Sequence, residues 1–118
     1  MKNTILQNKS YAFAIRIVKL SQYMQTERKE FVLSKQVLRS GTAIGALIRE
    51  AEFAQSRADF THKMSIALKE ANECDYWLSI IKDTSYIKEN LYESLYADCG
   101  ELISMLVSTV KSTKKQRT

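Results

Sequence analysis

Apolar and polar positions along this chain follow the period of an amphipathic helix, because apolar side chains recur at alternating four- and three-residue steps. Three short polar stretches interrupt the pattern, at residues 25–30, 55–57 and 83–85. The pattern therefore predicts four helices, at about residues 3–25, 34–54, 57–82 and 86–111.

The third predicted helix has the most regular apolar stripe. Its seven positions are Phe60, Met64, Ala67, Ala71, Cys74, Leu78 and Ile81. Sustained spacing of this kind, with short connections, favours helices that cross at about 20°. The sequence therefore predicts an all-α fold, an up-down antiparallel four-helix bundle.

Two serines are placed to start helices. Ser34 is expected to cap the second helix, because its hydroxyl can accept from a free first-turn N–H group. Ser56 and Asp59 form a variant of the capping box at the start of the third helix.

Composition supports a helical fold and favours a reducing cellular compartment. The 118 residues include no proline, three glycines and two cysteines, which leaves little chain for turns or for a disulfide framework. No apolar run approaches a membrane span, and the first residues do not resemble a signal peptide. We expect a cytoplasmic protein with one bundle domain at residues 1–110 and a basic, disordered tail at 111–118.

The helices carry more apolar surface than a narrow core requires. Small residues at 41, 43, 45 and 46 lie in mid-helix, where glycine costs about 1 kcal/mol relative to alanine, and this favours close approach of a neighbouring helix. The surplus predicts a homo-oligomer, with a broad monomer core as the alternative. The surplus apolar residues are Tyr11, Ile15, Val18, Trp77, Ile80, Tyr92 and Tyr96, and the charged interface candidates are Arg49 and Glu50.

Charge is divided along the chain. Residues 1–63 carry a net +6, residues 64–110 a net −5, and residues 111–118 a net +4. A basic face on the first two helices could bind phosphates, or it could pair with the acidic half of the same molecule or of a neighbouring subunit. The residues predicted to contact nucleic acid are Arg16, Lys19, Lys35, Arg39, Lys111, Lys114 and Lys115.

Residue types that carry catalysis are sparse. His62 is the only histidine, and no phosphate-binding loop, dinucleotide motif or nucleophile elbow is present. Cys74 and Cys99 occupy apolar stripes at similar distances from the last turn, so we expect free buried thiols, with contact between them left open. The sequence predicts no enzyme activity, no cofactor and no metal site.

Residues 36–51 and 58–73, with Tyr76-Trp77-Leu78, resemble the "four helix bundle protein" family, also called the 23S rRNA intervening-sequence protein family. The resemblance spans about residues 10–87 and implies a bundle that assembles as a ring-shaped homo-oligomer, typically a pentamer. Some members are encoded in insertions within 23S rRNA genes, and similar proteins accompany reverse transcriptases of diversity-generating retroelements. Leu47 departs from the family, which often has Asn there, so any role of that amide is in doubt.

Two functions follow as hypotheses. The first is a non-catalytic homo-oligomer that binds structured RNA or DNA through the basic surface. The alternative is a protein–protein adaptor or scaffold that docks a nucleic-acid enzyme such as a reverse transcriptase.

Overall fold

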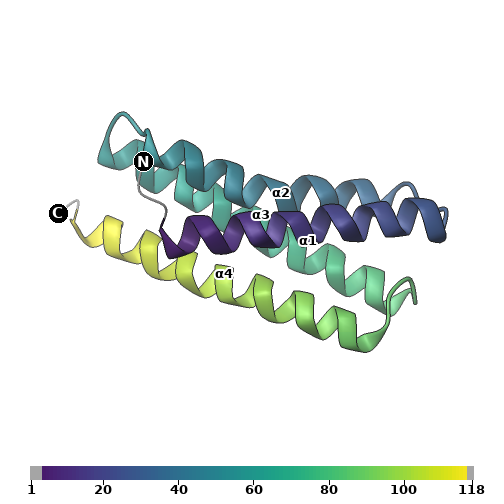
Figure 1. Ribbon diagram of the computed structural model, residues 1–118. Coiled ribbons are helices and arrows are strands. Elements are labelled where there is room, and N and C mark those ends of the chain that lie inside the picture. Colours follow the sequence, from purple (N-terminus) through teal and green to yellow (C-terminus); the bar gives the residue numbers. More distant parts are fainter. Residues whose placement is uncertain (1–3, 117–118) are drawn as a thin grey trace.

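The computed structural model describes residues 4–116 and contains four helices, with no strand among those residues. The helices are α1 (Ile5–Glu27), α2 (Leu33–Glu52), α3 (Arg57–Asp83) and α4 (Glu89–Gln116). They run alternately up and down, so the start of α1 and the end of α4 lie at the same end of the molecule (Figure 1). The predicted all-α four-helix bundle is confirmed, and its assembly into a ring stays a prediction.

Neighbours in sequence are neighbours in space. α2 packs against α1 and α3, α3 packs against α4, and α4 closes the bundle against α1 with fewer close approaches than the other pairs make. In Figure 1, α4 diverges from α1 toward the α3–α4 turn. The α1–α4 seam is therefore the open seam of the bundle, and the α1–α2 seam is one of its close seams.

The predicted core stripes are largely buried. On α3 the stripe is buried from Met64 to Ile81, and Phe60 at its start is half-buried. On α4 the side chains of Leu95 and Leu102 enter the core, while Tyr96 remains exposed. The bundle thus turns these leucines inward and leaves the tyrosine hydroxyl near water.

The expected cap of α2 was wrong. The helix begins at Leu33, so Ser34 lies inside its first turn. The Glu30 carboxylate takes the capping role, accepting from the N–H groups of Val32, Leu33 and Ser34 at 3.1, 2.9 and 2.8 Å. Burial raises the pKa of Glu30, but these backbone hydrogen bonds together with the Ser34 hydroxyl outweigh it, and the net pKa is lowered from 4.5.

The start of α3 agrees with the prediction. Ser56 Oγ accepts from the Asp59 N–H group at 3.0 Å, and the Asp59 carboxylate accepts from the N–H group of Gln55 at 3.2 Å. The reciprocal bond thus goes to the residue before the cap, which makes the arrangement a variant of the capping box.

The disordered tail predicted from residue 111 is corrected for residues 111–116, which continue α4 as helix. No glycine or proline follows Val110 to stop the helix, and Lys114 and Lys115 lie in its last turn, where cations are favoured by the helix dipole. Residues 117–118 of that prediction lie outside the described part of the chain.

The mid-helix glycines of α2 face α1 of the same chain. A methyl group at Gly41 would lie 2.7 Å from Ile17 Cγ2, and one at Gly45 would lie 3.3 Å from Ser10 Oγ. The close approach that the small residues predict is made by α1 of the same chain, so these glycines do not support association with a second subunit. Leu47, at the family's Asn position, is half-buried and packs against the core.

Both cysteines are free and buried between α3 and α4. Interaction with the Cys99 thiol, followed by burial, raises the pKa of Cys74 far above its ordinary value. The Cys99 thiol also donates to the Ala71 carbonyl at 3.4 Å. Within residues 4–116, no helix is both long and apolar enough to cross a membrane.

Candidate nucleic-acid interface

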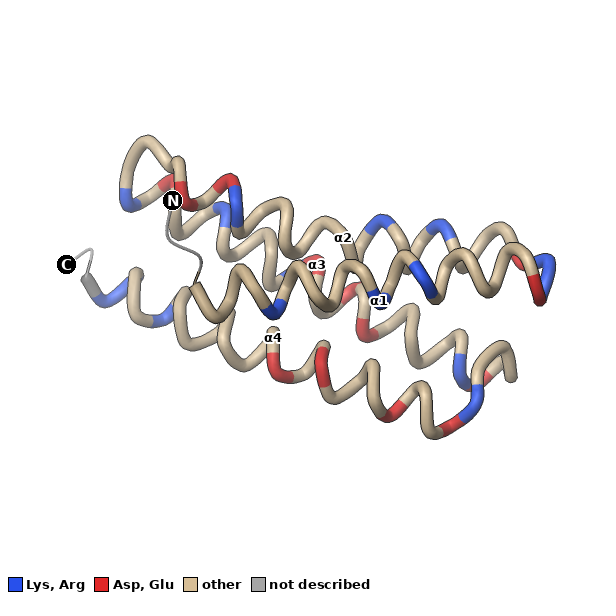
Figure 2. The backbone as a smooth tube through the Cα atoms, viewed as in Figure 1, with Lys and Arg blue, Asp and Glu red and all other residues tan. Residues whose placement is uncertain are grey.

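The outer face of α2 carries a cationic stripe, which we call the α2 stripe. It comprises Lys35, Arg39, Thr42, Ala46 and Arg49, at alternating four- and three-residue spacing. The three cations are exposed, and none of them forms an ion pair with a residue between 4 and 116. Figure 2 shows Lys and Arg positions along α1 and α2, whereas α4 carries a run of Asp and Glu positions.

The cations of α1 are used differently. Lys9 Nζ lies 3.1 Å from Glu101 Oε1, and Arg16 Nη1 lies 2.7 Å from Asp98 Oδ2, so both pair with α4. Lys19 is exposed and has no such partner among the described residues. Pairing between the basic and acidic halves of one molecule, the alternative left open by the sequence, thus holds for Lys9 and Arg16.

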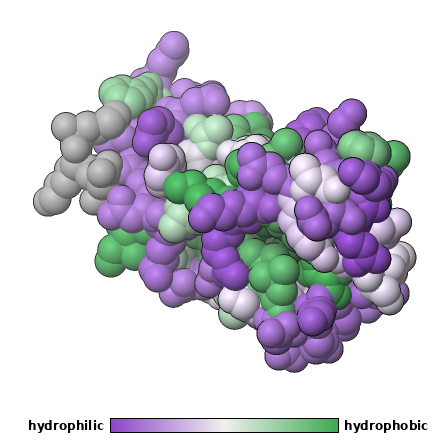
Figure 3. All heavy atoms as spheres, turned by 45° about the vertical axis from the view of Figure 1, so that its right-hand side comes forward, coloured by the Kyte–Doolittle hydropathy of each residue, from purple (hydrophilic) through white to green (hydrophobic). Residues whose placement is uncertain are grey.

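The open seam between α1 and α4 contains two hollows that share Tyr23, and together we call them the Tyr23 groove. The first has a volume of about 320 Å³ and is lined by Arg16, Lys19, Leu20, Tyr23, Leu91 and Leu95. The second, of about 540 Å³, extends over Arg28, Tyr86 and Lys88 at the α3–α4 turn. Figure 3 shows hydrophobic side chains in a hollow with hydrophilic borders at this end of the bundle.

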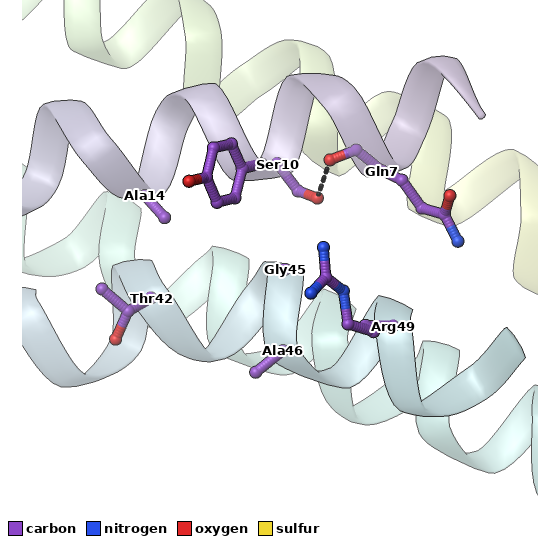
Figure 4. A pocket seen from close by; sticks show the side chains of 8 residues that line it. Gln7, Ser10, Ala14, Thr42, Gly45, Ala46 and Arg49 are labelled. Carbon is purple, nitrogen blue, oxygen red and sulfur yellow. Dashed lines mark hydrogen bonds between the residues drawn. The ribbon is translucent and has the colours of Figure 1, made fainter. Parts of the chain in front are cut away.

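A smaller groove lies between α1 and α2 beside the α2 stripe. Its volume is about 260 Å³, and its walls include Tyr11, Ser10 and Arg49. In Figure 4 the Arg49 side chain reaches from α2 toward α1 beside Ser10, whose hydroxyl donates to the Gln7 carbonyl. Arg49, predicted from sequence as an interface candidate, therefore lies with the phosphate-binding candidates on α2.

The predicted nucleic-acid contacts fall in three places. Lys35 and Arg39 lie on the α2 stripe, and Arg16 and Lys19 line the Tyr23 groove. Lys111, Lys114 and Lys115 line a hollow near the end of α4, at the opposite end of the 49 Å bundle from Lys35. One protomer therefore brings together only part of the predicted set.

Sequence reasoning missed the groove residues Tyr23, Arg28 and Lys88. A signal for Tyr23 existed, since it lies seven residues after Arg16 and therefore on the same helix stripe. No comparable signal marked Arg28 or Lys88, because only the turn geometry brings them to the groove.

The predicted interface residues remain candidates on the surface. Tyr11, Ile15 and Tyr96 are 62%, 42% and 48% exposed, and Val18 and Tyr92 are half-buried. The rings of Tyr92 and Tyr96 stack with centroids 5.5 Å apart. Arg49 and its neighbour Glu50 separate, because Glu50 lies 3.6 Å from Lys63 Nζ on α3.

Titratable groups with shifted pKa values do not converge on one place. Glu30 caps α2, and Cys74 lies in the core. Desolvation raises the pKa of Asp75 on α3, and hydrogen bonding to Asp83 followed by interaction with Glu89 raises that of Lys82. Nor do residues 4–116 contain a cluster of three His, Cys, Asp or Glu side chains that could hold a metal ion.

Comparisons place the chain among known proteins. Residues 2–108 match the family model for the 23S rRNA-intervening sequence protein. A crystal structure at 1.70 Å of a protein of unknown function from the S23 ribosomal protein family of Bacteroides thetaiotaomicron VPI-5482 is similar, with 55% identity and a TM-score of 0.90. The similarity covers 91% of this chain and 99% of that one. No curated protein matches the chain significantly.

Proposed function

The chain belongs to the 23S rRNA-intervening sequence protein family, and from that premise we propose that it is a cytoplasmic, non-catalytic homo-oligomer that binds structured RNA or DNA through its basic surface. The contacts are made chiefly by Lys35, Arg39 and Arg49 of the α2 stripe.

The observation that carries this proposal is the contrast between paired and unpaired cations. Lys9 and Arg16 are neutralised by carboxylates of α4, whereas Lys35, Arg39 and Arg49 have no carboxylate partner within residues 4–116. Unpaired cations repeated along one helix face can each release a counterion from nucleic acid, and such release supplies most sequence-independent binding.

The proposal predicts a steep salt dependence. Three phosphate contacts from one protomer predict a loss of affinity of about 40-fold between about 50 and 200 mM salt, and an oligomer multiplies the number of contacts. Fluorescence anisotropy of a labelled structured RNA and of a blunt DNA duplex, each at both salt concentrations, measures this directly.

The matching variant is Lys35→Glu with Arg39→Glu, which we expect to abolish binding. Single reversals provide a matched comparison, because Lys69 is an exposed cation on α3 outside the α2 stripe. Arg39→Glu should weaken binding and Lys69→Glu should leave it close to wild type. Equal effects of the two, or no effect of the double variant, would contradict the assignment.

The oligomer belongs to the same proposal. Its support is the exposure of Tyr11 and Ile15 on α1 and of Tyr96 on α4, side chains that association would bury. We expect light scattering to give a multiple of the 13.6 kDa protomer mass, and family resemblance favours five copies. Tyr11→Glu with Ile15→Glu should lower that mass. A 13.6 kDa particle at micromolar concentration would refute this part.

A protein-docking role is the second candidate function. It is favoured by Phe31 and Val32 in the α1–α2 turn and Phe53 after α2, which are more than half exposed. In this role the bundle would dock a nucleic-acid enzyme such as a reverse transcriptase. Weak, salt-insensitive nucleic-acid binding together with loss of partner binding in Phe53→Ser would favour it over the first candidate.

A further inference from the structure

The Tyr23 groove combines an apolar floor with a cationic border. Leu20 and Leu95 are buried at its floor, and Leu91 is partly exposed beside them. Tyr23 lies where the two hollows meet, and 40% of its surface is exposed. An aromatic ring that remains accessible in an apolar concavity can stack against another flat ring.

The charges of the groove are only partly neutralised. Arg16 pairs with Asp98, and Lys82 pairs with Asp83 and Glu89. The remaining cations that line the groove are Lys19, Arg28 and Lys88, and within the described chain none of the three has a carboxylate partner. The groove therefore has an excess of positive charge, which favours an occupant that carries negative charge.

Arg28 is held in position at the α3–α4 turn. Its Nη1 donates to the carbonyl oxygens of Ser85 and Tyr86 at 3.1 and 3.0 Å, and its guanidinium carbon lies 5.1 Å from the Tyr86 ring centroid. Carbonyl groups and a ring face orient the guanidinium without cancelling its charge. The groove thus presents cations on both sides of Tyr23, with Lys19 and Arg16 on one side and Arg28 and Lys88 on the other.

We propose that the Tyr23 groove binds a single-stranded segment of RNA or DNA, with a base stacked on Tyr23 over the apolar floor and the flanking phosphates on Lys19, Arg28 and Lys88. This inference rests on the proposed nucleic-acid binding and adds the class of ligand. A base stacked inside a duplex cannot reach an aromatic ring in a groove, whereas an unpaired base can. The apolar floor suits the base, and the unpaired cations suit the backbone.

A structured RNA offers both kinds of ligand at once. Its helical parts present phosphates to the α2 stripe, and its loops present unpaired bases to the Tyr23 groove. The two surfaces are separate on the protomer, so they can be tested separately.

The test compares labelled oligouridylate and oligothymidylate, each of about 15 nucleotides, with a blunt DNA duplex by fluorescence anisotropy. Tyr23→Ala should weaken binding of the single strands by about 10- to 100-fold, which is the range for loss of one stacked base. It should leave duplex binding unchanged, and Tyr23→Phe should retain single-strand binding because the ring face remains. Comparison of the RNA and DNA strands shows whether the 2′-hydroxyl is also recognised.

Two controls separate stacking from structure. Tyr76→Ala removes a tyrosine of α3 that lies outside the groove and is more exposed than Tyr23, and it should not change either affinity. In the wild-type protein, photo-crosslinking from an oligonucleotide that contains 5-iodouridine should label Tyr23, as mapped by mass spectrometry. Lys19→Glu with Lys88→Glu should also weaken single-strand binding.

The outcomes distinguish the two proposals. If Tyr23→Ala binds single strands like wild type while duplex binding remains salt-steep, the groove inference fails and the proposed function stands. Equal loss of duplex and single-strand binding in Tyr23→Ala, or crosslinking only to a tyrosine outside the groove, would also overturn the inference. If the wild-type protein binds neither ligand at low salt, both proposals are wrong.

Discussion

Helix α1 forms two seams that are built in opposite ways. Against α2 it packs so closely that a methyl group at Gly41 would lie 2.7 Å from Ile17. Against α4 it approaches less closely, and the seam contains the ion pairs Lys9–Glu101 and Arg16–Asp98 and a hollow of about 320 Å³.

The difference between the two seams assigns them different roles, one in stability and the other in ligand access. In its buried part the α1–α2 seam is close-packed, because Gly41 has no side chain and an added methyl group would find no space beside Ile17. The α1–α4 seam is held partly by ion pairs of which both partners are accessible to solvent, and such pairs contribute about 0–1 kcal/mol. The close seam therefore fixes the bundle, and the open seam leaves a surface that a ligand can occupy.

Gly41→Ala breaks the close seam and has the largest expected effect. The added methyl group would press on the fully buried side chain of Ile17, and overpacking of this kind costs about 1–3 kcal/mol beyond what alanine gains as a helix former. We expect the free energy of unfolding to fall by about that amount, as measured by urea denaturation followed by circular dichroism.

Gly100→Ala is the matched control on α4. A methyl group there meets no described atom within 4 Å, so the helix propensity of alanine should stabilise the protein by up to about 1 kcal/mol. Equal stability of Gly41→Ala and wild type would mean that the α1–α2 seam is not closely packed.

Glu30→Ala tests the cap at the start of α2, where the α1–α2 turn leads into the close seam. Loss of the three hydrogen bonds to the start of α2 should cost about 1 kcal/mol at neutral pH. Because the pKa of Glu30 is lowered in the folded state, its contribution is complete above the unfolded pKa and is lost as the pH falls through the folded value. The stability difference between wild type and variant should therefore shrink below about pH 4.5, as followed by urea denaturation at several pH values.

Glu27→Ala controls for charge at the same turn, because Glu27 is exposed and accepts no hydrogen bond from a described residue. Its stability should match wild type within about 0.5 kcal/mol. A stability difference for Glu30→Ala that stays constant down to pH 3 would exclude the ionised carboxylate as the cap.

Asp98→Asn removes one ion pair from the open seam. It has the smallest expected effect on stability, at most about 1 kcal/mol. It removes the carboxylate 2.7 Å from Arg16 Nη1 and frees that cation for phosphate. Nucleic-acid affinity should rise, with the slope of log affinity against log salt concentration steeper by about one. Glu70→Gln on α3 makes the same change in net charge outside the groove, and an equal gain from it would show that only net charge matters.

The fold was predictable from sequence because a helix that buries one face must repeat its apolar residues at the helical period. A stripe such as Met64 to Ile81 can only be buried on one side of a helix, and short polar breaks leave little choice of topology. Details at helix ends were less predictable. The cap of α2 comes from Glu30, four residues before the serine expected to provide it, because the turn folds the carboxylate back onto three N–H groups.

The candidate site was predictable only in part. Charge counts placed cations on the first two helices, yet they could not tell Arg16, which Asp98 neutralises, from Arg39, which no described carboxylate neutralises. That difference depends on which helices become neighbours and on which residues then lie at the same level along the bundle axis. Arg16 and Asp98 are 82 positions apart, so no local sequence pattern indicates that they pair.

The sequence by itself determined the four helices, their antiparallel order and the excess of positive charge in the first half of the chain, since periodicity and charge are local properties. Only the tertiary structure decided that α1 packs closely on α2 and openly on α4, that acidic residues of α4 neutralise two cations of α1, and that Tyr23, Arg28 and Lys88 line one groove. The physical reason is that packing distance and ion pairing are properties of pairs of elements, and the pairs exist only once the chain has folded.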